Sequence, residues 1–213
     1  MTTTCQMCEK RRAKRACPGV HGDICPQCCG EQREVTILCP LDCEFLVEAR
    51  KHDRPPEMAK TPLPHLDVPL TEQFMRDHHD LVLFTSFTLV AAALETEGAV
   101  DADVREALEA MIKTLRTLDT GLLYETRPAN HFAAAIQTRV QVAFEDVKAR
   151  MAEQTGLTTL RDAEFLGVLV FLVRVAAQHD NRRPRGRAFL DFLRSQFPVT
   201  PSKSSDGASL VTE

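Results

Sequence analysis

Apolar side chains recur at three- and four-residue spacing through residues 70–197, and this spacing predicts a series of helices. Thr71 is placed to cap a first helix that runs to Glu97, where Gly98 would stop it. Later helices are expected from Asp101 or Asp103, after Pro128, from near Thr159, and from about Arg187 to Phe197. No alternating strand pattern is visible in this half. The fold class is therefore predicted to be mainly α, with an antiparallel bundle of four to five helices.

Two of the predicted helices are strongly apolar, and their length bears on membrane insertion. The stretches 81–94 and 165–177 are both shorter than the roughly 18 residues that a membrane span needs. The first contains three hydroxyl side chains and the second contains Arg174. No apolar run precedes the basic residues near the N-terminus, so no secretory signal is predicted. We expect a cytoplasmic protein that does not bind membranes.

Composition divides the 213-residue chain into four segments. All eight cysteines lie in residues 1–54, which are predicted to form a cysteine-rich zinc-binding module. Residues 55–69 contain five prolines and are expected to form a linker or a surface strap. The helical bundle occupies 70–197, and the polar residues 198–213 are predicted to be a disordered tail. The apolar share of 44% is ordinary for a soluble protein and excludes collagen-like and fully disordered classes.

The cysteines are spaced as metal ligands. They form four short-range sets: Cys5 and Cys8; Cys17 with His21; Cys25 with Cys28 and Cys29; Cys39 and Cys43. In a reducing compartment such sets are typical of metal binding rather than of disulfides. Tetrahedral zinc takes four donors, so four sets predict two zinc ions per chain. Metal binding would then supply much of the folding free energy of this small module.

The spacing leaves the partnering of the sets open. A cross-brace would join the first set to the third and the second to the fourth. Its sites would be Cys5, Cys8, Cys25 and Cys28, and Cys17, His21, Cys39 and Cys43. Cys29 would then be spare or exchange with Cys28, or it would replace His21 in an eight-cysteine arrangement. His52 is a further candidate ligand. The sets could also pair sequentially, the first with the second and the third with the fourth. Iron–sulfur binding, or redox use of the 25–28 motif, is an alternative to zinc.

The run CPQCCGEQREVTILCPLDCEFL, which begins at Cys25 and leads to Ala49 and Arg50, carries a resemblance. It resembles the N-terminal signature of an uncharacterised bacterial family that joins a small cysteine-rich module to a helical region. The ligand order is also broadly similar to cross-brace fingers of the HIT and MYND type. That resemblance implies two structural zinc ions and a protein-binding role. The final histidine and cysteine pair of those fingers is absent, and Cys39 and Cys43 would take its place.

Charge raises the question of nucleic-acid binding. The net charge of the chain is −4, yet residues 55–173 carry −8 and residues 174–194 carry +4. Two basic clusters could contact phosphates: Lys10, Arg11, Arg12, Lys14 and Arg15, and Arg182, Arg183, Arg185 and Arg187. The chain has no tryptophan and one tyrosine, which leaves little for base stacking.

The sequence contains no phosphate-binding glycine loop, no GxSxG elbow and no HExxH motif. No catalytic or cofactor-binding residue is therefore nominated beyond the metal ligands, and the protein is not expected to be an enzyme. The leading hypothesis is a structural zinc-binding adaptor that binds another protein. A nucleic-acid-associated zinc protein that uses the two basic clusters is the first alternative. A thiol redox sensor that uses Cys28 and Cys29 is the second.

Overall fold

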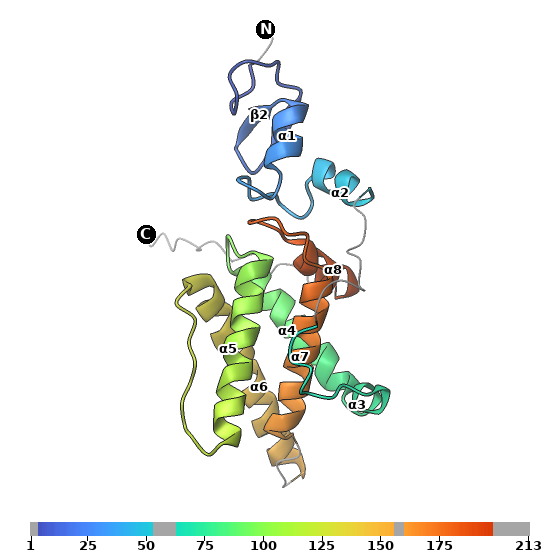
Figure 1. Ribbon diagram of the computed structural model, residues 1–213, viewed down its shortest axis with the longest axis vertical. Coiled ribbons are helices and arrows are strands. Elements are labelled where there is room, and N and C mark those ends of the chain that lie inside the picture. The colour runs from blue at the N-terminus through green and yellow to red at the C-terminus, as the bar shows by residue number, and fades with distance from the viewer. Residues whose placement is uncertain (1–3, 53–62, 156–159, 198–213) are drawn as a thin grey trace, which may run out of the picture.

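The computed structural model describes residues 4–52, 63–155 and 160–197 (Figure 1). The N-terminal part contains the hairpin β1 (Arg15–Cys17) and β2 (Gly22–Ile24), followed by α1 (Pro26–Gln32) and α2 (Glu44–Arg50). The remaining elements are α3 (Glu72–Asp77), α4 (His79–Glu95), α5 (Asp101–Asp119), α6 (His131–Thr155), α7 (Asp162–Gln178) and α8 (Ala188–Gln196). The predicted fold class is confirmed: a short hairpin with clustered cysteines precedes a set of packed helices.

Residues 4–52, hereafter the N-terminal module, have a small core of their own. The strands pair antiparallel, with Arg15 opposite Ile24. α1 begins where Pro26 takes the first helical position and the Cys25 sulfur accepts a hydrogen bond from the Cys28 backbone N–H. The core beside the cysteines consists of Ile24, Ile37 and Leu46. With so few apolar side chains, this core needs additional stabilisation.

The helical bundle contains a second and larger core. Its centre is built from α4, α5, α6 and α7, and α8 adds the buried Phe189 and Leu190. The predicted helix from residue 71 to residue 97 is divided at His78 into α3 and α4. Thr71 caps α3 as expected, because its hydroxyl accepts a hydrogen bond from the Phe74 N–H at 3.1 Å.

One pair of helices departs from a simple antiparallel order. Gly121 ends α5 with a φ of +82°, and the chain then runs back along that helix. The Thr126 N–H donates to the Thr114 hydroxyl at 2.9 Å, and the Asn130 amide donates to the Asp103 carboxylate. α6 therefore begins beside the start of α5, and these two helices run parallel (Figure 1).

The described end of the proline-rich segment lies against α7. Arg174 donates hydrogen bonds from its guanidinium to the backbone oxygens of Pro64, His65 and Val68 at 3.0, 2.6 and 3.0 Å. This role explains a charged residue in an otherwise apolar helix. The rest of the predicted linker (55–62), Thr159 and the predicted tail (198–213) lie outside the described residues. No helix in the described ranges has both the length and the hydropathy to cross a membrane.

The N-terminal module is joined to the bundle by the carboxylate of Glu34, which is 2% exposed. Arg50 and the Arg187 backbone N–H each donate to Oε1 at 2.9 Å, and the Asn181 amide donates to Oε2 at 2.9 Å. The Arg185 N–H also donates to the Glu34 backbone oxygen at 2.8 Å. A buried carboxylate is stable only when it is paired in this way. The two cores are therefore connected through a polar interface.

Candidate metal centre

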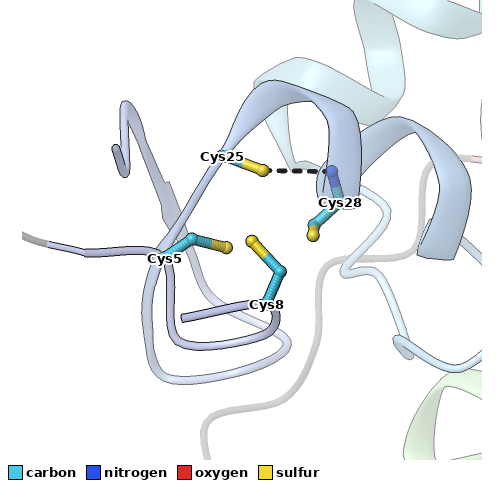
Figure 2. Close-up of side chains that lie close together, drawn as sticks. All are labelled: Cys5, Cys8, Cys25 and Cys28. Carbon is cyan, nitrogen blue, oxygen red and sulfur yellow. Dashed lines mark hydrogen bonds between the residues drawn. The ribbon is translucent and has the colours of Figure 1, made fainter. Parts of the chain in front are cut away.

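Four cysteines from two separate parts of the module converge on one point (Figure 2). The sulfur atoms of Cys5, Cys8, Cys25 and Cys28, hereafter the first thiol group, all lie within 4.8 Å of one another. Cys5, Cys25 and Cys28 are buried and Cys8 is half-buried. This is the group that the cross-brace pairing predicts. Four thiolate donors fit a tetrahedral metal ion such as zinc.

The backbone holds the first two ligands in a tight turn. The Glu9 N–H donates to the Cys5 oxygen and the Cys5 N–H donates to the Arg11 oxygen, both at 2.8 Å. The Gln6 N–H donates to the Asp23 oxygen at 3.0 Å and so fixes this turn on β2. The Gln6 side chain then lies over Gly22, where its amide group occupies the space that a Cβ atom would take.

The thiols of the first thiol group titrate unequally. Hydrogen bonds from the Lys10 and Arg11 backbone N–H groups lower the pKa of Cys8 to about 6. The hydrogen bond from the Cys28 N–H is the main cause that lowers the pKa of Cys25. Arg11 lowers the pKa of Cys28, but burial and the three neighbouring thiols outweigh this effect and raise it to about 12. A bound dication would favour the thiolate form of all four cysteines.

Arg11 belongs to this centre. Its guanidinium donates to the Cys28 sulfur at 3.4 Å and to the Gln27 side-chain oxygen. Four thiolates around a dication carry a net charge of −2, and an adjacent guanidinium stabilises such a charge. The sequence groups Arg11 with basic residues that could contact phosphates, whereas in the structure its guanidinium lies against the Cys28 sulfur.

The ligands predicted for the second cross-brace site do not lie as close to one another as the sulfur atoms of the first thiol group. Within residues 4–52, 63–155 and 160–197, the first thiol group is the one set of three or more cysteine, histidine or carboxylate side chains whose ligand atoms lie within 4.8 Å of one another. Cys17 and Cys43 are half-buried and Cys29 and Cys39 are buried. His21 is exposed, and the His52 side chain is 78% exposed and lies 3.5 Å from Glu48. Two zinc ions per chain therefore remain a prediction.

The basic clusters are divided between surface and interface. Lys10, Arg12 and Lys14 are exposed, as are Arg182 and Arg185. The Arg15 guanidinium lies 4.4 Å from the centroid of the Phe45 ring. The Arg183 guanidinium donates to the Arg33 backbone oxygen at 2.6 Å, and Arg187 is half-buried beside Glu34. Part of the second cluster thus holds the module against the bundle.

Glu34 is the residue that sequence analysis missed. It stands between the third and fourth cysteine sets and looks like a surface residue in the sequence. Its φ of +53° is unusual for a residue other than glycine, but the sequence carries no signal of that conformation. Its partners lie 16 to about 150 positions away along the chain, so only the folded chain brings them together.

Comparison of the chain with protein-family models, with curated proteins and with solved structures gave no match. The resemblance to a bacterial family therefore supports no family assignment. What the structure supports is a four-cysteine group able to hold a metal, followed by a helical region.

Proposed function

We propose that this protein is a zinc-stabilised interaction protein whose partner is another protein. In this proposal zinc holds the N-terminal module in its folded form, and it takes no part in a reaction. The helical bundle then presents a surface to the partner. The metal is proposed to be zinc because four thiolates in a tight cluster are the usual donor set of structural zinc.

The observation that carries the structural role is the saturation of the first thiol group. A catalytic zinc site keeps one position for water or substrate, usually beside histidine or carboxylate ligands. Here four sulfur donors would complete the tetrahedral shell of a bound zinc, and Cys5 is 0% and Cys25 2% exposed. A metal bound there would be closed to substrate. This arrangement favours folding energy over catalysis.

The surface that favours a protein partner is the loop after α5. Its side chains Leu122, Leu123 and Tyr124 are 64%, 94% and 66% exposed. The loop is anchored at Thr126, whose oxygen accepts a hydrogen bond from the buried Gln137 amide at 2.8 Å. A pinned loop that displays three consecutive large apolar side chains is typical of a protein contact. Phosphate binding would call for cations at this position instead.

The test compares three forms of the full-length chain as bait in nuclease-treated extract of the native cells. They are the wild type, the double variant Leu122→Ser/Leu123→Ser, and the control Val142→Ser, which removes an isolated apolar side chain that is 56% exposed on α6. We expect the wild type and the Val142→Ser control to capture the same partner protein. The double variant should reduce its recovery roughly tenfold or more.

Three results would overturn the proposal. One is recovery of the same proteins with all three baits. Another is capture of nucleic acid from a parallel extract without nuclease, with no protein retained from either extract, which would favour the nucleic-acid hypothesis. The third is release of zinc by mild peroxide together with a change in binding, which would favour the redox sensor.

A further inference from the structure

The four cysteines outside the first thiol group share one small core. Cys17, Cys29, Cys39 and Cys43, hereafter the second thiol group, are all free thiols. Cys29 and Cys39 belong to the buried core of the module, and Cys17 and Cys43 pack against it. Three separate segments of the module thus deliver four sulfur atoms to one compact region.

The turn that begins at Cys17 packs directly on the segment that leads to Cys39. The Val20 N–H donates to the Cys17 backbone oxygen at 3.2 Å and closes the turn. A Cβ atom on Gly19 would lie 2.6 Å from the Leu38 oxygen and 2.7 Å from Ile37 Cγ2. This approach, which only glycine permits, places Cys17 next to the fourth cysteine set.

α1 separates its two adjacent cysteines. Successive side chains on a helix point about 100° apart. Because Cys28 points into the first thiol group (Figure 2), Cys29 faces a different direction while remaining buried. Cys43 lies at the N-cap of α2, where its N–H donates to the Pro40 oxygen at 3.1 Å and closes the turn from Cys39.

The second thiol group repeats two features of the first. The backbone N–H groups two and three positions after Cys17, on Gly19 and Val20, lie near enough to its sulfur to lower the Cys17 pKa, as those of Lys10 and Arg11 do for Cys8. Each α1 cysteine also has a guanidinium beside it. Arg11 donates to the Cys28 sulfur at 3.4 Å, and Arg33 donates to the Cys29 sulfur at 3.8 Å. Such N–H···S contacts orient metal ligands and disperse their charge.

The four sulfur atoms also act on one another electrostatically. Burial is the main cause that raises the pKa of Cys17, and the charges of Cys29 and Cys43 raise it further. Burial likewise raises the pKa of Cys39, and the charges of Cys43, Glu34 and Cys17 raise it further. These cysteines therefore lie close enough to sense one another's charge, within the small core that they share.

We propose that Cys17, Cys29, Cys39 and Cys43 close on a second zinc ion, with no histidine in the ligand set. This inference rests on the proposed structural role of zinc in the module. The sulfur atoms are farther apart than those of the first thiol group, so binding requires rotation of their side chains toward a common centre. His21 is exposed with a φ of +54°, and the hairpin turn that carries it leaves its side chain in solvent.

The test is the zinc content of purified full-length protein, measured by elemental analysis against protein concentration from amino-acid analysis. Wild type should contain two zinc ions per chain. Cys29→Ser should contain one, and His21→Ala, which removes the competing ligand, should retain two. Cys8→Ser should also contain one, since it disrupts the first thiol group and leaves the second.

A second measurement covers the case in which Cys29→Ser loses both ions because the module unfolds. Cobalt(II) replaces zinc and reports sulfur ligands through its charge-transfer absorption. Wild type and His21→Ala should bind two cobalt ions with the same sulfur-to-metal absorption per ion, as eight cysteine ligands require. One zinc in the folded wild type, or a lower zinc content in His21→Ala, would overturn the second site. Neither result would affect the capture of a protein partner, so the two proposals fail separately.

Discussion

The polar interface between module and bundle depends on the side chain of Glu34, and its removal is the most direct perturbation of this fold. Glu34→Ala deletes the hydrogen bonds from Arg50, from the Arg187 backbone N–H and from the Asn181 amide. The alanine leaves these three donors without their acceptor in a region that excludes water. The Arg185 N–H keeps its bond, because its acceptor is the backbone oxygen of residue 34.

The magnitude follows from the burial of the pair. Glu34 is 2% exposed and the Arg50 side chain is 14% exposed. Removing one partner of a buried ion pair costs about 3–5 kcal/mol, because the other charge is left without compensation. Arg50 retains an ion pair with Asp191, so we expect the lower end, about 3 kcal/mol. Glu34→Gln keeps an acceptor oxygen and should cost about 1–2 kcal/mol.

The assay combines urea denaturation at fixed free zinc with amide hydrogen exchange. The matched control is Glu31→Ala, an exposed residue of α1 that accepts a hydrogen bond from the Gln27 side chain at 2.8 Å. This change should alter the free energy of unfolding by less than about 0.5 kcal/mol. In Glu34→Ala the Arg187 amide should lose its protection, and undocking would expose the Arg185 amide as well.

Glu34→Ala and Glu31→Ala could instead unfold at the same urea concentration, with unchanged exchange at the Arg187 amide. That outcome would refute the role of the Glu34 carboxylate in joining the module to the bundle. Such a result would mean that the module and the bundle are held together by something other than this carboxylate. A drop in stability without faster exchange at Arg187 would locate the damage inside the module instead.

Three other predictions concern zinc, pH and packing. Chelation of zinc should unfold residues 4–52 and leave most helical circular dichroism, because the two cores are separate; loss of all helical signal would contradict this. Burial raises the pKa of Asp101 to about 6, so its contribution to stability is complete below about pH 4 and is lost as the pH rises past 6. Between pH 4 and pH 6 the free energy of unfolding should therefore decrease less for Asp101→Asn than for the wild type, and the two decreases should differ by up to about 3 kcal/mol. Parallel plots of unfolding free energy against pH would argue against the raised pKa. Gly167→Ala should destabilise the bundle by about 1–3 kcal/mol because its methyl group would overlap the Phe74 ring, whereas Gly30→Ala, with nothing within 4 Å, should be neutral or stabilising in the same thermal melts.

The cysteine spacing predicted the short-range ligand sets, and a cross-brace was one of the pairings that it allowed. The structure chose that pairing for the first thiol group, because folding brings Cys5 and Cys8 beside Cys25 and Cys28. The spacing was not sufficient to choose between His21 and Cys29. That choice depends on which way each side chain points, and the structure shows His21 exposed and Cys29 buried beside Arg33. Likewise the periodicity predicted the helices but not the break at His78, which requires a backbone conformation that the apolar pattern does not encode.

The sequence by itself determined the local features of this protein: a module of cysteines spaced as metal ligands, a proline-rich segment and a set of helices. These follow from residues close together in the chain, where spacing and helix period suffice. Only the tertiary structure decided that α5 and α6 run parallel, that Arg11 lies against a cysteine ligand, and that Glu34 joins module to bundle. Those contacts connect residues up to about 150 positions apart, and they exist only because packing of the two cores brings distant polar groups into the same buried space.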